Sequence, residues 1–273
     1  MKRISPYKTG LDSGNAYWMA RLSKEVYVKT SEEDQTPDEK KILESLKADD
    51  DQFISIKGAD ANSAQAALIE HKNYLCMAFR GTNEVKDWLD NINAFSVKVL
   101  FGEFHRGFWN SVEDVWAPLD AELRALQARI PRPVFFTGHS LGGAMAVIAA
   151  AKYVHEDKPF TGLYTFGQPR TMTRETSRIF NAECRSRYFR FHNNNDIVTR
   201  IPARIMGYSH AGTYLYIDSK GGIHQEPGHW FAFIDHLSGV VDAITQDGID
   251  AVEDHYIDRY IVPVAEWQFE NAD

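Results

Sequence analysis

The sequence has few cysteines, no long hydrophobic run and no recognisable leader. Its two cysteines, Cys76 and Cys184, are too few for a disulfide scaffold, and we expect two free thiols, with a single disulfide as the alternative. No stretch approaches the roughly 18 consecutive apolar residues of a membrane span, so we expect no transmembrane segment. Residues 4–10 lack the apolar core of a Sec signal peptide. We therefore expect a cytoplasmic protein, or one that leaves the cell by a non-Sec route or as a mature form.

Positive charge is also scarce, because 30 Lys and Arg face 38 Asp and Glu for a formal net charge of −8. This balance disfavours nucleic acids and anionic membrane surfaces as partners, and it suits neutral or apolar substrates. No H-E-x-x-H motif occurs, and His224, His229 and His236 lack the spacing of metal ligands, so we expect no catalytic metal. The sequence indicates no protein partner.

Internal repeats, low-complexity segments and linkers rich in Pro, Gly or Ser are absent, which predicts one domain over residues 1–273. Apolar periodicity predicts helices and strands in alternation. Helices are expected at 11–27, 107–129 and 174–184. A further helix is expected to start at a capping box in residues 36–39 and to end near residue 48. Strands are expected at 53–57, 65–70, 74–79, 95–100, 133–137, 160–166, 187–192 and 213–217. The alternation is typical of an α/β fold with a mostly parallel central sheet flanked by helices.

The most informative motif is Gly138-His139-Ser140-Leu141-Gly142, which follows an apolar strand and opens a helix of small residues. In that setting G-x-S-x-G is a nucleophile elbow, in which a strained turn lifts a serine hydroxyl out of the sheet toward a substrate carbonyl. The glycines leave room for the tight turn. We therefore predict an α/β-hydrolase fold with Ser140 as the nucleophile.

A serine nucleophile needs a histidine base, and the base needs a carboxylate that holds its tautomer. In α/β-hydrolases the chain order is Ser, then Asp or Glu, then His. Asp196 follows a predicted strand in an Asn-rich loop and is the candidate acid. Among the later histidines we favour His255 as the base, with His236 and His210 as alternatives.

An oxyanion hole needs two N–H donors near the elbow. Phe79-Arg80-Gly81-Thr82 closes a buried strand, and the amide next after the nucleophile belongs to Leu141. We predict that Thr82 and Leu141 are the donors, Thr82 through its N–H and hydroxyl. The alternative at Thr82 is an ordinary turn after a strand.

These motifs occur together with His105-Arg106-Gly107-Phe108, Thr165-Phe166-Gly167-Gln168-Pro169-Arg170 and Asn195-Asp196-Ile197-Val198. From about residue 65 to 260 the set resembles the class 3 lipase family, which contains the fungal triacylglycerol lipases. The resemblance implies a triad of Ser140, Asp196 and His255 and an oxyanion hole of Thr82 and Leu141. It also implies hydrolysis of acylglycerols, phospholipids or other carboxylic esters without a cofactor. Fungal members are secreted and disulfide-bonded, so this cysteine-poor chain resembles a bacterial branch more closely.

In similar lipases a short lid helix lies between the oxyanion strand and the next strand. Here that position holds residues 83–93, with apolar side chains at Val85, Trp88, Leu89 and Ile92 on one face of an expected helix. We predict a lid whose apolar face meets the substrate. The alternative is a helix packed permanently on the core.

The residues predict a serine esterase with a Ser-Asp-His acyl-enzyme mechanism. The resemblance implies that it cleaves acylglycerols, as a triacylglycerol lipase does, at a lipid–water interface. The alternative within the enzyme class is a carboxylesterase or phospholipase A1, acting on soluble esters or phospholipids. The alternative outside it is an inactive lipid-binding protein that retains the fold.

Overall fold

The computed structural model describes residues 2–82, 85, 92–226 and 253–269. An eight-stranded sheet runs through the molecule in the order β1-β2-β3-β6-β7-β9-β11-β12. Its strands are β1 (Phe53–Ala61), β2 (Ala64–His71), β3 (Tyr74–Phe79), β6 (Val134–His139), β7 (Gly162–Phe166), β9 (Tyr188–Asn193), β11 (Thr213–Ile217) and β12 (Ile223–Gln225). Strands β3, β6, β7, β9 and β11 pair in parallel, whereas β1, β2 and β12 add antiparallel pairings at the two edges. The expected mostly parallel sheet is confirmed at its centre.

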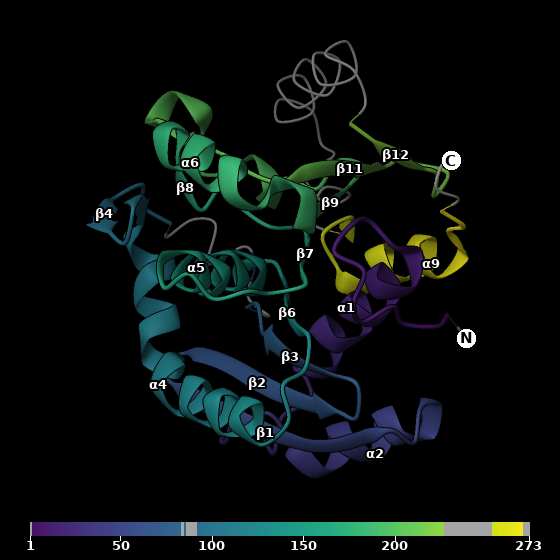
Figure 1. Cartoon of the computed structure of the whole chain (residues 1–273). Coiled ribbons are helices and arrows are strands. Elements are labelled where there is room, and N and C mark those ends of the chain that lie inside the picture. The colour runs from purple at the N-terminus through teal and green to yellow at the C-terminus, as the bar shows by residue number, and fades with distance from the viewer. Residues whose placement is uncertain (1, 83–84, 86–91, 227–252, 270–273) are drawn as a thin grey trace.

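Helices cover both faces of this sheet, with α4 and α5 on one side and α1 and α9 on the other (Figure 1). The helices are α1 (Ser13–Glu25), α2 (Glu39–Asp49), α4 (Arg106–Arg129), α5 (Leu141–His155), α6 (Arg174–Cys184) and α9 (Ile257–Glu266), with 3₁₀ turns η1 (Arg185–Arg187), η2 (Val198–Arg200) and η3 (Arg204–Met206). Among the described residues no helix combines the length and the apolar character needed to cross a bilayer.

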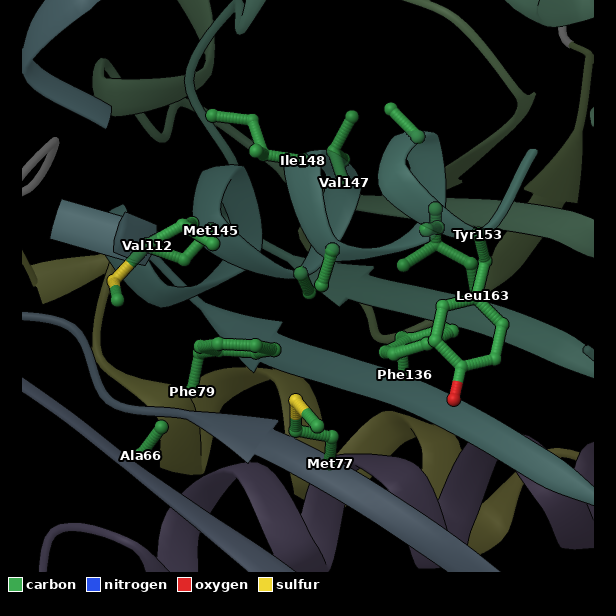
Figure 2. Packing of buried hydrophobic residues seen from close by; sticks show 14 of the residues in the cluster. Ala66, Met77, Phe79, Val112, Phe136, Met145, Val147, Ile148, Tyr153 and Leu163 are labelled. Carbon is green, nitrogen blue, oxygen red and sulfur yellow. The ribbon is translucent and has the colours of Figure 1, made fainter. Parts of the chain in front are cut away.

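Each face of the sheet has its own apolar core. On one face, Met145 of α5 belongs to the same apolar cluster as Met77, Phe79 and Phe136 of the strands (Figure 2). On the opposite face, side chains from α1, α2 and α9 pack on the other side of the same strands. The central strands are therefore buried on both faces, which explains why they appear in the sequence as continuous apolar runs.

A second, four-stranded sheet is made of short antiparallel strands in the order β10-β8-β5-β4. These are β4 (Ser96–Val99), β5 (Gly102–His105), β8 (Met172–Thr173) and β10 (Tyr208–Ser209). Of these, the sequence predicted only the strand at 95–100, because two- to four-residue strands carry too little periodicity to be seen.

Two local expectations can be compared with the structure. The capping box at 36–39 is wrong in register, because Asp38 is the N-cap of α2, and its carboxylate accepts from the Lys41 amide at 3.0 Å. Pro37 lies one position before this N-cap, in an antiparallel bridge with Lys29, so it does not begin the helix. The expected free thiols are confirmed, since Cys76 and Cys184 are both buried and unbridged.

Candidate active site

Ser140 lies between the end of β6 and the first residue of α5, at the carboxyl edge of the parallel strands. Its backbone has φ 59° and ψ −131°, a strained conformation for a residue with a side chain. A Cβ on Gly138 would meet the Gly142 carbonyl oxygen at 2.2 Å, and a Cβ on Gly142 would meet the Phe79 oxygen at 2.1 Å. The two glycines of the motif therefore sit where no side chain fits, as the elbow prediction requires.

Neighbouring strands bring the other candidate residues to the same edge. The Ser140 amide donates to the Phe166 carbonyl at the end of β7, and the Gly167 amide donates to Phe191 in β9. Asp196 follows β9 in a short loop, and His255 lies in the turn before α9. Residues far apart in the sequence thus meet where three adjacent parallel strands end.

The structure pairs the candidate acid with the favoured base. His255 Nδ1 lies 2.9 Å from Asp196 Oδ2, and neither side chain has appreciable exposed surface. The other carboxylate oxygen of Asp196 accepts from the Val198 amide at 2.9 Å. Because the carboxylate accepts from Nδ1, it selects the imidazole tautomer whose Nε2 lone pair is available as a base.

Tyr260, on α9, provides a third contact to the same carboxylate. Its hydroxyl donates to Asp196 Oδ2 and accepts from the Asn193 amide at 3.1 Å. Burial alone would raise the pKa of Asp196, but the neighbouring His255 and the hydrogen bonds from His255 and Tyr260 lower it. Asp196 is therefore held ionised, which suits a residue that orients a base and stabilises its positive charge.

The loop that carries Asp196 and the turn that carries His255 are joined directly. Asp254 Oδ2 accepts from the Asn194 side chain at 3.0 Å and from the Asn195 amide at 3.2 Å. The Asn193 side chain donates to the Asp254 carbonyl at 2.9 Å. These bonds hold the two segments in one register, so that the Asp196–His255 contact does not depend on a single interaction.

The contact between Ser140 and His255 is not formed. Ser140 Oγ and His255 Nε2 are both buried, and neither has a hydrogen-bond partner among the residues that the structure describes. Two buried polar atoms without partners are costly unless a ligand or a rearrangement satisfies them. In apo enzymes the bond from nucleophile to base is often long and shortens only with substrate bound. We therefore expect these two atoms to complete the site during the reaction.

The predicted oxyanion donors lie on both sides of Ser140. Thr82 lies three residues after the end of β3, and a Cβ on the preceding Gly81 would come within 2.8 Å of the Ser140 Cβ. Leu141 is the first residue of α5, where the helix offers its amide no internal acceptor. The segment that carries Thr82 and the N-terminus of α5 therefore both adjoin the serine, and the role of Thr82 and Leu141 as oxyanion donors stays a prediction.

The remaining predicted residues are placed as follows. His210 Nε2 lies 2.7 Å from the Thr199 carbonyl oxygen and is not paired with Asp196. Of the predicted lid residues, Val85 is buried and Ile92 packs against the core, whereas Trp88 and Leu89 lie outside the described residues. His236, the alternative base, and His229 also lie outside them. Within the described ranges no three His, Cys, Asp or Glu side chains gather as a metal site would require.

Sequence reasoning missed two contributors to the site, Tyr260 and Gly167. Apolar residues at 257, 261 and 264 signal the helix that carries Tyr260, but nothing in the sequence pairs its hydroxyl with a residue 64 positions away. Gly167 has φ +61°, and a Cβ there would meet Asp196 Oδ2 at 2.8 Å and the His255 ring at 3.0 Å. It lies in the motif Thr165-Phe166-Gly167-Gln168-Pro169-Arg170, whose sequence alone does not indicate a role for the glycine.

A central parallel sheet, a serine elbow after its middle strand and an Asp–His pair at the neighbouring strand ends define the α/β-hydrolase class. The family described as Lipase (class 3) matches residues 76–206. Over these residues the chain is similar to the class 3 lipase family. Its place in a bacterial branch of the family stays a prediction.

Three comparisons show how close the similarity is. The secreted mono- and diacylglycerol lipase 1 of Fusarium solani is 32% identical over 160 residues, which cover 57% of this chain and 47% of that protein. A phospholipase A1-II 1 of Oryza sativa subsp. indica is 28% identical over 158 residues, 50% of this chain and 39% of that protein. The Rhizomucor miehei triacylglyceride lipase structure superimposes with a TM-score of 0.65 at 22% identity, covering 77% of this chain and 81% of that one. The chain spans about half the length of the curated relatives it matches.

Proposed function

We propose that the chain is a serine esterase that hydrolyses the ester bonds of acylglycerols, with Ser140 as nucleophile, His255 as general base and Asp196 as the orienting carboxylate. The observation that supports this most directly is the buried Asp196–His255 hydrogen bond beside a strained elbow serine, with Ser140 Oγ and His255 Nε2 both unpartnered among the described residues. Similarity to the family supports the same chemistry.

The proposed reaction is a two-step acyl transfer. His255 Nε2 takes the Ser140 proton as Oγ attacks the ester carbonyl, and Asp196 stabilises the imidazolium that forms. The amides of Thr82 and Leu141 bind the negative oxygen of the tetrahedral intermediate. The imidazolium then protonates the departing alcohol, and His255 activates a water molecule that hydrolyses the acyl-enzyme.

Acylglycerols are the favoured substrate because relatives named as mono- and diacylglycerol lipases and as a triacylglyceride lipase are among the best matches. The net charge of −8 also suits a neutral lipid better than an anionic one. A phospholipase A1 activity is the second candidate, supported by the similarity to the rice phospholipase A1-II 1.

Segment 83–93 is proposed as the lid over the serine. Ser140 has no exposed surface, so an ester must displace covering residues to reach it. The apolar spacing of Val85, Trp88, Leu89 and Ile92 would give a moving segment one face suited to a lipid surface.

The test is the initial rate on tributyrin as its concentration passes the solubility limit, with Ser140→Ala as the blank. A jump in rate at the limit is expected from a lipase whose lid opens at an interface. Smooth saturation below the limit would indicate a carboxylesterase with an open site. No activity above the Ser140→Ala blank would contradict the proposed function and favour an inactive lipid-binding protein.

A further inference from the structure

Three hydrogen bonds link the parts of the candidate site through residues that take no part in the proposed reaction. The Gly81 amide donates to the Tyr27 hydroxyl at 3.1 Å, and that hydroxyl lies 2.8 Å from His139 Nδ1. The other ring nitrogen, His139 Nε2, lies 2.6 Å from the backbone carbonyl oxygen of His255. The chain of bonds thus runs from the residue before Thr82 to the backbone of the proposed base.

The proton positions in this chain follow from its two ends. A carbonyl oxygen only accepts, so His139 Nε2 carries the proton and donates to His255. Burial, with a smaller contribution from the charge of His255, lowers the pKa of His139 to about 3, so the ring is neutral and Nδ1 is an acceptor. The Tyr27 hydroxyl must then donate to Nδ1 while its oxygen accepts from Gly81. Each donor in this series of three hydrogen bonds therefore has one acceptor, and all three bonds point from Gly81 toward His255.

The chain also fixes the spacing between the nucleophile and its neighbours. A Cβ on Gly81 would come within 2.4 Å of the Tyr27 hydroxyl and 2.8 Å of the Ser140 Cβ, so the three groups are in close contact. The rings of His139 and His255 lie with centroids 4.6 Å apart, and both side chains are buried. Three of the segments that form the site, the strand end before Thr82, the elbow and the His255 turn, thus share one buried polar network.

We propose that Tyr27 and His139 are positioning residues that hold the oxyanion donor of Thr82 and the backbone of His255 in register with Ser140. This rests on the proposed function. Gly81 precedes Thr82, so fixing the Gly81 amide limits the direction in which the Thr82 amide points. The His255 carbonyl, fixed by His139, limits the position of the imidazole. Neither Tyr27 nor His139 forms a hydrogen bond with Ser140 Oγ or His255 Nε2.

The experiment is kinetic, on a soluble ester, p-nitrophenyl butyrate, with the affinity for a boronic acid as a second readout because its tetrahedral adduct occupies the oxyanion hole. Tyr27→Phe removes the hydroxyl and nothing else. Its kcat is expected to fall about tenfold with KM within about twofold, and boronic acid affinity is expected to weaken by a similar factor, since the loss acts on the transition state.

Two conservative changes at His139 test its hydrogen bonds to Tyr27 and to His255 separately. His139→Asn keeps an acceptor toward Tyr27 and loses the donor to His255, whereas His139→Gln keeps a donor toward His255 and loses the acceptor. Because Tyr27→Phe and His139→Gln break the same contact, the double variant is expected to be no slower than the slower single variant.

The matched controls are Tyr74→Phe and His71→Asn, which alter buried residues at the opposite end of β2 and β3. They are expected to lower thermal stability without changing kcat. The proposal is overturned if Tyr27→Phe folds and keeps the wild-type kcat. It is also overturned if the effects of Tyr27→Phe and His139→Gln on kcat multiply in the double variant, or if the two controls lose as much kcat as Tyr27→Phe. A wild-type protein that hydrolyses no ester and binds no boronic acid would instead overturn the proposed function itself.

Discussion

Gly167 shows how closely the Asp196–His255 pair is enclosed. A methyl group at this position would lie 2.8 Å from Asp196 Oδ2 and 3.0 Å from the His255 ring, and the backbone φ of +61° already disfavours a side chain. The glycine therefore sets the space in which the carboxylate and imidazole meet. Because Gly167 has no side chain, its backbone lies close to Asp196 and His255 and helps to bury both side chains.

We expect Gly167→Ala to lower kcat by about 10- to 100-fold, because displacement of a catalytic group by a fraction of an ångström misaligns it. The matched control is Gly207→Ala, since Gly207 has φ +87° but its added methyl group would meet nothing within 4 Å. Gly207→Ala is expected to lose stability and keep kcat. Equal kcat in Gly167→Ala and wild type would show that the pair tolerates displacement.

The sequence identified Ser140, Asp196 and His255 because each lies in a short motif or in a loop at a strand end. It did not identify Tyr260, Tyr27 or the role of His139. These residues act through contacts between segments 54 to 116 positions apart, which appear only when the strands are assembled. Local pattern therefore points to the groups that we propose react, and tertiary contacts reveal the groups that hold them.

Among the elements, the long periodic ones were predicted well. The strand expected at 74–79 matches β3, and the helix expected at 107–129 begins one residue early, at Arg106. Pairing direction was less accessible, since β1 and β2 are antiparallel to their neighbours and nothing in their own residues signals that direction. The helix α9 was missed because its ten residues include Pro263, which is unfavourable inside a helix.

The lid proposal belongs to segment 83–93 and is tested at Trp88. If its apolar face meets lipid, Trp88→Ala should lower activity on emulsified tributyrin by about tenfold, because a large apolar side chain no longer contacts the lipid. Activity of the same variant on soluble p-nitrophenyl butyrate serves as the internal control and should stay near wild type. An unchanged ratio of the two activities would mean that the segment is a fixed helix.

Across the whole molecule, buried neutral histidines make stability depend on pH. Burial is the main cause that lowers the pKa of His139 and of His192 to about 3 in the folded protein, against roughly 6.5 in the unfolded chain. Between these values the unfolded chain binds two more protons than the folded one. Their contribution is fully present above pH 6.5 and is lost as the pH falls toward 3.

We expect the free energy of unfolding to fall by up to about 3 kcal/mol per pH unit between pH 6 and 4 from these two groups. Urea unfolding at a series of pH values measures this slope. His139→Gln removes one of the two groups and should lower the slope by up to about 1.4 kcal/mol per pH unit. A free energy of unfolding that stays constant between pH 7 and 4 would show that these histidines are protonated in the folded protein.

The most direct test of the triad is covalent labelling by a fluorophosphonate, read by intact mass and peptide mapping. A serine activated by His255 and Asp196 should give one adduct, on Ser140, and none in Ser140→Ala. His255→Ala should label slowly, and its kcat should fall by roughly 10⁴ to 10⁶, because triad members act as a unit. An unlabelled wild-type protein, or an adduct on another residue, would contradict the assignment of Ser140 as the nucleophile.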